Sequence, residues 1–397
     1  MARIGMGIVG AGFVGPHHVD AVRRLGFVDV VAVAGSNDDS GRRKASVLGA
    51  RRGYGSYQAL VDDPEVQVVH VATPNYLHYE VACAALAKGK HVVSDKPLAT
   101  TAAEAKRLVD ALERSGLVGA VTFNYRGNPL VQQARHAVAQ GEIGRPTFLH
   151  GYYLQDWLLH DTDWNWRLEP DRGGALRAVG DIGSHWLDLI TFVTGQHVSA
   201  VFADLTTFIG ARHEPTGPVE TFSTDRSAET VARPISTEDI ASILLRFDGG
   251  ARGSVTVSQI SPGRKNSLQY EIDGSTAAWY WDSEQPDQAW IGHRDTPNEI
   301  LIRNPAMLGE AGRAAAALPG GHVEGFFDTF CAHFRAVYTD VVAGAVSSGP
   351  GYPTFADGHD EMLVGDAIAA SAREGRWVDV DRRSATHSIP VTTEAHG

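Results

Sequence analysis

The sequence predicts an α/β protein with two domains: a doubly wound parallel sheet at the N-terminus, followed by an α+β domain with an open, mainly antiparallel sheet. The 397 residues exceed the size at which one hydrophobic core usually stops growing. Strand-like and helix-like stretches alternate over the first ~120 residues, and short β runs separated by turns follow later in the chain. We therefore expect domains at 1–125 and 126–382 and a flexible tail at 383–397.

The N-terminal domain has the rhythm of successive βαβ units. Its predicted strands are apolar runs, at 4–10, 28–36, 66–74, 90–97 and 118–125. The predicted helices between them include 17–26, 41–50 and 79–89. The last of these ends on a glycine, which suits a helix C-terminus.

The pattern changes after the fifth strand. A predicted helix at 129–144 leads to a strand at 145–157 and to a second helix that begins after Gly183. Residues 238–282 contain short β runs separated by the turn sequences DGG, SPGRKN and DGS, which is typical of an antiparallel meander. We expect residues 211–235, rich in Pro, Thr, Glu and Arg, to form a long loop.

The composition excludes several classes of partner. The chain carries 35 Lys and Arg residues against 47 Asp and Glu residues, and no basic stretch offers a footprint for nucleic acid. Cys83 and Cys331 form no CxxC pair, which argues against a disulfide framework and favours a reducing cytoplasm. The first residues lead into a strand without a signal-peptide pattern, and no apolar run is long enough to span a bilayer. We expect a cytoplasmic protein with no membrane partner.

A glycine-rich turn follows the first strand. Gly10, Gly12 and Gly15 have GxGxxG spacing, with Phe13 and Val14 between the last two. Such a turn lets the backbone approach a pyrophosphate, whose charge the N-terminus of the next helix stabilises, as in Rossmann dinucleotide-binding domains. Glycine-rich strand exits also occur without a nucleotide, but the position at the start of a βαβ series favours a cofactor site that includes Gly10, Gly12, Phe13 and Val14.

The end of the second strand lacks the acidic residue that would hold the ribose 2′-hydroxyl of NAD. Gly35 and Ser36 occupy this tip, Asn37 follows, and Arg42 begins the basic run RRK. The arrangement leaves room for a 2′-phosphate, so we predict NAD(P) as the cofactor, with NADP favoured over NAD. The same basic run could instead be a solvated helix face.

Lys96 directly follows the fourth strand, at the carboxyl edge where open α/β sheets bind ligands. A lysine there can donate a hydrogen bond to a substrate oxygen and stabilise negative charge that develops on it. An ordinary surface lysine in a strand-to-helix turn is the alternative.

The segment GGALRAVGDIGSHWLDLITFVTG places Asp181 four residues before His185 at the start of an apolar helix. Helical spacing predicts a buried stripe of Trp186, Leu189, Ile190 and Val193. A second stripe, rotated away from that core, contains Asp181, His185, Asp188 and Phe192. A dehydrogenation needs a base for the hydroxyl proton, which histidine can supply, and a nearby carboxylate would orient the ring. Alternatively, Asp181 caps the helix and His185 is a satisfied polar neighbour.

Three motifs, namely the GxGxxG turn, SDKP at 94–97 and GGALRAVGDIGSHWLDL, together resemble the glucose–fructose oxidoreductase, inositol dehydrogenase and rhizopine-catabolism family over nearly the whole chain. The resemblance implies that Lys96 and His185 act on a sugar or cyclitol hydroxyl and that Asp181 assists both. Asp95 replaces the commoner Glu, a conservative departure that leaves the role of Lys96 intact. The resemblance also implies contacts with the cofactor from Ala72, Thr73, Pro74, Asn75, His78, Asp95, Lys96 and Asn124.

Four further segments, FNYRGNP, YYLQDW, DWNWR and GGHVEGF, resemble the levoglucosan dehydrogenase-like members, which oxidise pyranosides or anhydrosugars. Trp157, Trp164 and Trp166 could stack on a sugar, although at least one of them is expected to be structural. The side chains that could bind sugar hydroxyls are those of Tyr125, Arg126, Gln155, Asp156, Arg167, His322 and Glu324, together with Lys96, Asp181 and His185. The histidines show no HExxH or close ligand cluster, so no metal is expected.

The sequence thus predicts an NAD(P)-dependent dehydrogenase that oxidises a secondary hydroxyl, with C3 as the candidate, of a pyranose, glycoside or anhydrosugar, and that uses His185 as base. Three alternatives stay open: an NAD-dependent glycosidase acting by transient oxidation and elimination, a myo-inositol-type cyclitol dehydrogenase, and a non-catalytic nucleotide- and sugar-sensing regulator. The intact catalytic set argues against the last. Because the open sheet must cover its outer face, we expect homo-oligomerisation through it, and the resemblance implies a dimer or tetramer.

Overall fold

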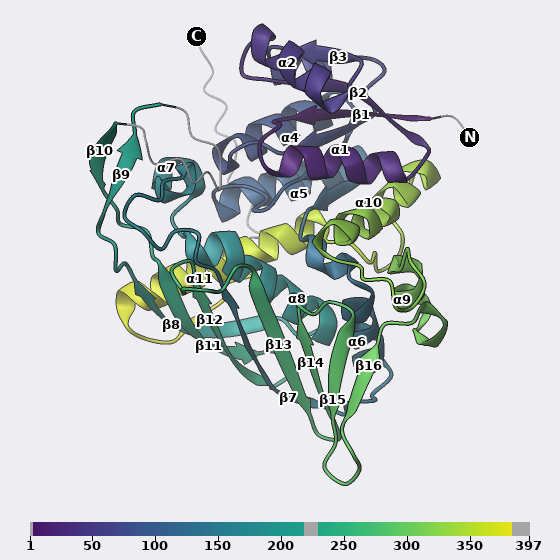
Figure 1. The fold of residues 1–397 in the computed structure, drawn as a ribbon, viewed down its shortest axis with the longest axis vertical. Coiled ribbons are helices and arrows are strands. Elements are labelled where there is room, and N and C mark those ends of the chain that lie inside the picture. The colour runs from purple at the N-terminus through teal and green to yellow at the C-terminus, as the bar shows by residue number, and fades with distance from the viewer. Residues whose placement is uncertain (1–2, 218–228, 383–397) are drawn as a thin grey trace, which may run out of the picture.

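The computed structural model describes residues 3–217 and 229–382. The N-terminal sheet has six parallel strands in the order β3-β2-β1-β4-β5-β6 (Figure 1). Their bounds are β1 Ile4–Val9, β2 Val28–Ala34, β3 Arg52–Tyr54, β4 Val68–Val71, β5 His91–Ser94 and β6 Gly119–Val121. The strand order reverses between β1 and β4, and a doubly wound sheet binds ligands at the carboxyl ends of the strands at such a point.

The helices of this domain connect the strands in sequence. They are α1 Val14–Arg24, α2 Asp38–Leu48, α3 Tyr57–Val61, α4 His78–Ala87 and α5 Ala102–Ser115. The five predicted strands and the three predicted helices are confirmed in position. Strand β3 was not among the predicted strands, because its three residues, RGY, contain no apolar run.

The second domain contains a nine-stranded sheet in the order β16-β15-β14-β13-β7-β12-β11-β8-β17. The strands are β7 Pro146–Leu154, β8 Val198–Thr206, β11 Ile240–Phe247, β12 Arg252–Ser258, β13 Ser267–Gly274, β14 Ala278–Asp282, β15 Gln288–Gly292, β16 Glu299–Ile302 and β17 Val378–Asp379. Only β7 and β12 pair in parallel within this described sheet. The predicted open, mainly antiparallel sheet is therefore confirmed.

Helices cover one face of the nine-stranded sheet and leave the other open (Figure 1). The covering helices include α6 Pro129–Ala139, α8 Ser184–Thr194 and α11 Phe355–Glu374. In α8 the predicted stripe of Trp186, Leu189, Ile190 and Val193 is buried. Side chains of β11 alternate between the covered core and the open face, where Leu244 is 49% exposed. The shorter helical segments are η1 Asn75–Leu77, η2 Asn124–Gly127, η3 Trp166–Leu168, α7 Pro170–Gly173, η4 Val179–Gly183, η5 Pro305–Met307 and α9 Glu310–Ala315.

Helix α10, Phe326–Ala343, packs against α1 of the N-terminal domain (Figure 1). Phe330, Phe334 and Tyr338 of α10 belong to the same buried cluster as Met6 and Val19. A segment placed by the sequence in the second domain thus completes the core of the first, which fixes the relative position of the two sheets.

The predicted loop at 211–235 is partly wrong. Its ends form a two-stranded antiparallel sheet, β9 Ala211–Pro215 with β10 Thr230–Pro234. These segments pair although they lack apolar alternation, which is why the sequence did not reveal them. Residues 218–228 and the predicted tail at 383–397 lie outside the described residues. Within the described ranges, no helix combines the length and the apolar character needed to cross a membrane.

Candidate active site

A cleft with about 1130 Å³ of empty space opens where the carboxyl edge of the N-terminal sheet faces the second domain. The first domain lines it with Phe13, Val14, Asp95, Lys96, Thr122 and Asn124. The second lines it with Tyr153, Gln155, Trp157, Arg167, Asp181, Ile182, His185, Lys265, Asn266, Phe326 and Phe330. The structure therefore gathers in one cleft residues predicted for the cofactor, the substrate and the chemistry.

Lys96 and Asp181 are in direct contact in this cleft. Lys96 lies two residues beyond β5, and its Nζ donates hydrogen bonds to Oδ1 of Asp181, at 2.8 Å, and to the carbonyl oxygen of the same residue. Arg167 Nε also donates to Oδ1, at 3.1 Å, while Nε2 of Gln259 donates to Oδ2 at 2.8 Å. Two of the three N–H groups of the lysine are thus directed at one residue, which leaves the third for a ligand.

Asp181 is not a helix cap. It lies in the π-helical turn η4, which runs without interruption into α8, and the first residue of α8 is preceded by Gly183, which has no capping side chain. The helical backbone keeps Asp181 and His185 four residues apart on adjacent turns, so both reach the same cleft. The alternative reading of Asp181 as a cap is therefore wrong.

The electrostatic environment keeps Asp181 ionised. Burial raises the pKa of this carboxyl, but the neighbouring charges of Lys96 and Arg167 outweigh burial and hold it well below its usual range. The cleft consequently contains a permanent carboxylate that fixes one ammonium group and one guanidinium group.

His185 lies against aromatic rings. Phe123 and Tyr125 meet its ring edge-to-face, with centroids 5.5 Å and 5.3 Å away, and Nδ1 is buried with no hydrogen-bond partner among the described residues. Burial first, and the charge of Lys96 second, lower the pKa of His185 well below its ordinary value. We expected Asp181 to orient this ring. Instead, the side chains that donate hydrogen bonds to the Asp181 carboxylate are those of Lys96, Arg167 and Gln259, and the ring of His185 is held by packing.

The second stripe on α8, predicted to be rotated away from the core of Trp186, is buried as well. Asp188 and Phe192, which share it with His185, are 1% and 7% exposed. Asp188 is buried because it forms an ion pair with Arg126, with Nε of Arg126 at 2.9 Å from Oδ2. Arg126 pairs with Asp357 as well and does not line the cleft, so it holds α8 and α11 rather than a sugar.

A network of hydrogen-bonded polar side chains forms the wall of the cleft beside His185. Oδ1 of Asn266 accepts hydrogen bonds from the Tyr153 hydroxyl at 2.6 Å and from Nε2 of Gln155 at 2.9 Å. Its Nδ2 donates to the Tyr125 hydroxyl at 2.8 Å, and the two tyrosine hydroxyls are 3.0 Å apart. Of these, Tyr125 and Gln155 were predicted. The wall offers neutral donors and acceptors of the kind that bind sugar hydroxyls.

The remaining predicted substrate residues lie in different places. Trp157 lines the cleft, whereas Trp164 packs against a small apolar cluster and Trp166 lies under the guanidinium of Arg167, 4.4 Å from ring centroid to Cζ. Asp156 pairs with Lys265 at the rim.

Residues 316–325, between α9 and α10, do not line the cleft. Glu324 is 1% exposed and pairs with Arg303, and His322 is exposed. Neither residue lines the cleft, because Arg303 ties this segment to the region of β16. The assignment of His322 and Glu324 to substrate is thus not supported by their positions.

The glycine-rich turn fits a dinucleotide. Gly10 has a φ of +87°, and a Cβ there would lie 2.4 Å from the carbonyl oxygen of Ala72, so the chain itself requires this glycine. A Cβ on Gly12 would meet nothing within 4 Å, so no contact within the chain explains that glycine. The hydroxyl of Thr73 is buried beside this turn with no hydrogen-bond partner among the described residues. An open backbone cradle and an unsatisfied hydroxyl are what a pyrophosphate and a ribose would use.

The other predicted cofactor residues surround this turn. Asn75 donates a hydrogen bond to the carbonyl oxygen of Gly173 at 2.7 Å. The ring nitrogens of His78 lie 2.7 Å from the Pro97 carbonyl oxygen and 2.9 Å from that of Thr73, so this fully buried histidine connects the segment after β4 with the segment after β5. Ala72 and Pro74 flank Thr73, and Asp95 and Asn124 line the cleft, where Nδ2 of Asn124 donates to the hydroxyl of Thr329.

At the end of β2, the close packing of α2 requires a glycine at position 35. A Cβ there would lie 2.5 Å from the backbone nitrogen of Gly41 in α2. Ser36 and Asn37 are exposed, and the Asn37 side chain caps α2 by accepting from the N–H of Ser40. Arg42 is exposed and pairs with Asp39 at 2.6 Å. The guanidinium group of Arg42 therefore lies about one turn into α2, the helix that follows β2.

Three residues of the site were not predicted from the sequence, namely Tyr153, Asn266 and Gln259. Tyr153 is contained in the quoted YYLQDW, but its neighbour in the chain, Tyr152, points to the opposite face, and only the register of β7 separates the two. Asn266 and Gln259 lie at strand ends without a motif. Within the described residues, one group could offer three metal-ligand atoms, His150, Glu271 and Asp273, and it lies on β7 and β13 outside the cleft.

The comparisons with known proteins agree with this geometry. Residues 4–123 match an oxidoreductase family with an NAD-binding Rossmann fold, and residues 131–280 match the GFO/IDH/MocA C-terminal domain. The fold and site thus define an NAD-binding oxidoreductase. The chain belongs to the GFO/IDH/MocA family, as its motifs predicted.

Several relatives cover nearly the whole chain. Levoglucosan dehydrogenase from Pseudarthrobacter phenanthrenivorans is 32% identical over 97% of this chain and 100% of its own length. A solved structure of levoglucosan dehydrogenase with NADH and L-sorbose has a TM-score of 0.86 and 30% identity, covering 96% of this chain and 100% of that one. Myo-inositol 2-dehydrogenase from Thermotoga maritima is 24% identical over 95% of this chain and 98% of its own length.

Proposed function

We propose that this enzyme oxidises a secondary hydroxyl of a pyranose, glycoside or anhydrosugar, with C3 as the candidate position, and that His185 is the base. The observation that carries the proposal is the convergence of Lys96, Asp181 and His185 in one cleft between the glycine-rich turn and the Tyr153–Asn266 wall. When bound, the nicotinamide cofactor supplies the hydride acceptor.

The chain's own residues handle the proton. His185 is neutral at physiological pH, since burial and Lys96 lower its pKa, so it can accept the hydroxyl proton. The free N–H of Lys96 donates to the same substrate oxygen and stabilises its developing negative charge. Asp181 holds the ammonium group in place through the 2.8 Å contact.

A sugar fits the opposite wall. Gln155 and Asn266 present amide groups, Arg167 presents a guanidinium group, and Trp157 adds an aromatic surface. The names of the full-length relatives, levoglucosan dehydrogenase and myo-inositol 2-dehydrogenase, agree with a polyhydroxylated ring as substrate. The higher sequence identity to the first, 32% against 24%, favours a pyranose-type ring over a cyclitol.

For the cofactor we propose NADP in preference to NAD. Ser36 and Asn37 leave the strand end uncharged and exposed. Both members of the Arg42–Asp39 pair are mostly exposed, 65% and 76%, and such pairs contribute about 0–1 kcal/mol. Arg42 can therefore leave Asp39 for a 2′-phosphate at little cost.

The test is a panel of pyranoses, glycosides, levoglucosan and myo-inositol, assayed at steady state with NAD and NADP separately. The proposal expects net accumulation of reduced cofactor with at least one pyranose-type substrate. Glycoside cleavage without such accumulation would indicate the glycosidase alternative. Tight nucleotide binding with no turnover on the whole panel would indicate the sensor, and myo-inositol as the best substrate would indicate a cyclitol dehydrogenase.

We also propose a homodimer or homotetramer that assembles through the open face of the nine-stranded sheet. Phe148, Leu244, Ile300 and Ile302 are 41–55% exposed along the strands β7, β11 and β16. Exposed apolar side chains spread over one sheet face are typical of an interaction surface. Light scattering at micromolar protein tests this, and a monomeric mass would contradict it. The two free cysteines agree with a cytoplasmic location, which cell fractionation would test.

A further inference from the structure

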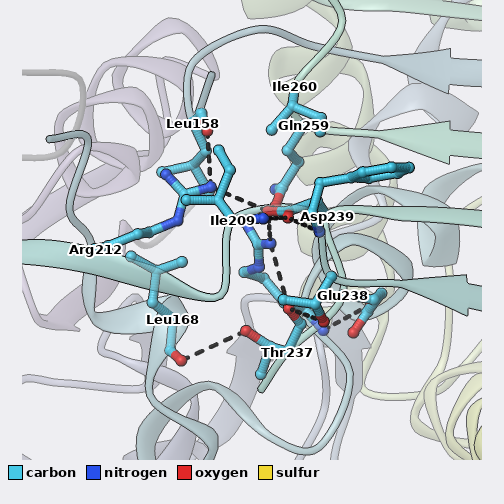
Figure 2. Close-up of polar contacts among 12 residues, drawn as sticks. Leu158, Leu168, Ile209, Arg212, Thr237, Glu238, Asp239, Gln259 and Ile260 are labelled. Carbon is cyan, nitrogen blue, oxygen red and sulfur yellow. Dashed lines mark hydrogen bonds and ion pairs between the residues drawn. The ribbon is translucent and has the colours of Figure 1, made fainter. Parts of the chain in front are cut away.

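A buried cluster of charged side chains lies beside Asp181 and has no part in the proposed chemistry. The side chains of Arg177, Arg212 and Asp239 are 0% exposed. Oδ1 of Asp239 accepts a hydrogen bond from Nη2 of Arg177. It also accepts one from Nη2 of Arg212, at 3.0 Å (Figure 2). Oδ2 accepts from the backbone N–H groups of Phe208 and Ile209, at 2.8 Å and 2.9 Å. One carboxylate thus holds two buried cations.

Gln259 connects this cluster to the active site. Its side chain is 0% exposed, Oε1 accepts from Nη1 of Arg177 at 3.4 Å, and Nε2 donates to Oδ2 of Asp181 at 2.8 Å. A guanidinium group can only donate and a carboxylate can only accept, so the two neighbours allow the amide a single orientation. The backbone N–H of Gln259 also donates to the carbonyl oxygen of Asp239 at 3.1 Å.

The same cluster holds the segment that leads to Asp181. Oε1 of Glu238 accepts hydrogen bonds from the backbone N–H groups of Arg177 and Val179, at 2.8 Å and 2.9 Å; Val179 is the first residue of η4 and Arg177 lies two residues before it. Arg177 is thus fixed at its backbone by Glu238 and at its side chain by Asp239. The turn that carries Asp181 has little freedom to rotate.

Arg212 connects the cluster to the loop that follows β7 and contains Trp157. Nη2 donates to the carbonyl oxygen of Leu158 at 2.8 Å, and Nη1 donates to that of His160 at 2.7 Å. These carbonyl groups belong to the loop that carries Trp157 into the cleft. Asp239 therefore links the segment of the proposed catalytic carboxylate with the segment of a proposed sugar contact.

We propose that Gln259 is a positioning residue for the carboxylate of Asp181, and that the Asp239–Arg177 ion pair fixes the orientation of the Gln259 amide. The inference rests on the proposed function, in which Asp181 holds Lys96 against the substrate oxygen. Lys96 and Arg167 occupy Oδ1, and Gln259 occupies Oδ2. Without Gln259, the carboxylate can turn about its χ2 bond and carry Lys96 out of position.

The first test is Gln259→Met, which keeps a similar volume but removes the amide. We expect kcat to fall about tenfold to a hundredfold, the effect of losing one hydrogen bond to a charged group. Cofactor affinity should stay within about twofold of wild type, since Gln259 does not line the cleft. A Gln259 that only filled space would leave kcat unchanged in this variant.

The second test is Gln259→Glu, which keeps the shape and the contact with Arg177 but adds an anion beside Asp181. Added negative charge favours protonation of both Asp181 and His185, so the acid limb of the kcat/KM profile should move to higher pH. The matched control is Gln133→Glu in α6, where the side chain is also buried and accepts the Gly309 N–H at 2.7 Å, remote from the cleft. The control should not move the limb.

A readout without turnover separates this inference from the proposed function. The ¹⁵N and ¹H signals of the Lys96 ammonium group, recorded by NMR at neutral pH, should shift in Gln259→Met relative to wild type, because the carboxylate that binds this group is no longer held at Oδ2. An unchanged Lys96 signal, or a folded Gln259→Met with wild-type kcat and pH profile, overturns the positioning role. Absence of sugar oxidation by the wild-type enzyme contradicts the proposed function alone, because the Lys96 signal still decides the contact.

Discussion

Nζ of Lys96 lies 2.8 Å from Oδ1 of Asp181, and the two side chains are only 11% and 13% exposed. Lys96 follows β5 of the first domain and Asp181 belongs to η4 of the second, so the pair joins the domains across the cleft. An ion pair with so little exposure is favourable only when its remaining bonding capacity is satisfied, and Arg167 and Gln259 do this for the carboxylate.

The first prediction concerns Asp181→Asn, which keeps the size of the side chain and removes its charge. Turnover should fall well over tenfold, because Lys96 loses the carboxylate that holds it in place. Some turnover should remain, because His185 can still act as the general base. The free energy of unfolding should fall by about 3 kcal/mol or less, because two largely buried cations lose their counter-charge. Steady-state kinetics and chemical denaturation measure the two effects.

A double variant separates these effects. Adding Lys96→Met to Asp181→Asn removes the uncompensated ammonium group and should restore part of the stability, whereas activity should stay low. Full activity in Asp181→Asn would show that the ion pair is structural only.

The second prediction concerns the base. His185→Ala should lower turnover by roughly two to four orders of magnitude, the usual contribution of general acid–base catalysis, with cofactor affinity nearly unchanged. The acid limb of the wild-type kcat/KM profile should lie below pH 6.5, because burial and Lys96 lower the pKa of His185. Stopped-flow reduction of the cofactor measures the rate, and an acid limb above pH 7 would argue for another base.

The sequence could predict the pair of Asp181 and His185 because both lie on one short motif, and their spacing on a helix determines that they share a side. It could not predict that Arg126 forms an ion pair with Asp188, since 62 residues separate them and the pairing depends on how α8 packs. The same holds for Gln259, whose contact with Asp181 spans 78 residues. Local periodicity determines the elements, whereas the polar partners depend on tertiary packing.

The third prediction uses the two glycines of the nucleotide turn. Gly12→Ala should leave the melting temperature near that of wild type, because its Cβ would meet nothing within 4 Å, and should weaken dinucleotide binding. A tenfold or larger rise in Kd is expected, roughly, where a methyl group blocks the backbone approach to a pyrophosphate. Gly10→Ala should instead destabilise the fold by about 1–3 kcal/mol, owing to its positive φ and to the nearby Ala72 carbonyl oxygen. Fluorescence titration and thermal unfolding distinguish the two.

The fourth prediction concerns acid stability. Burial lowers the pKa of His18 and of His333 from 6.5 to about 3, and both lie in the core between α1 and α10. The unfolded chain therefore binds more protons than the folded one between pH 6.5 and 3, so the free energy of unfolding falls as pH decreases through this window. Each histidine contributes a slope of up to about 1.4 kcal/mol per pH unit.

A variant of His333 tests this slope. Neither ring nitrogen of His333 has a hydrogen-bond partner within the described chain, so His333→Leu sacrifices no such bond. Between pH 6 and 4.5 its free energy of unfolding should depend less on pH than that of wild type, whereas His160→Gln, at an exposed position, should follow wild type. Urea denaturation at several pH values gives the slopes, and parallel slopes for His333→Leu and wild type would contradict the prediction.

The last prediction concerns cofactor choice. Substitution at Gly35 is unsuitable for this test, since a Cβ there would lie 2.5 Å from the nitrogen of Gly41 and would disturb the fold. Ser36 is exposed, so Ser36→Asp can introduce the missing carboxylate without strain, and it should reduce kcat/KM with NADP by about tenfold or more through repulsion of the 2′-phosphate. Arg42→Ala should lower kcat/KM with NADP and leave that with NAD nearly unchanged, whereas the exposed neighbour in Arg43→Ala serves as the control. If the wild-type enzyme prefers NAD by a wide margin, and Arg42→Ala affects both cofactors equally, then Arg42 remains paired with Asp39 and the uncharged strand end does not select the phosphate.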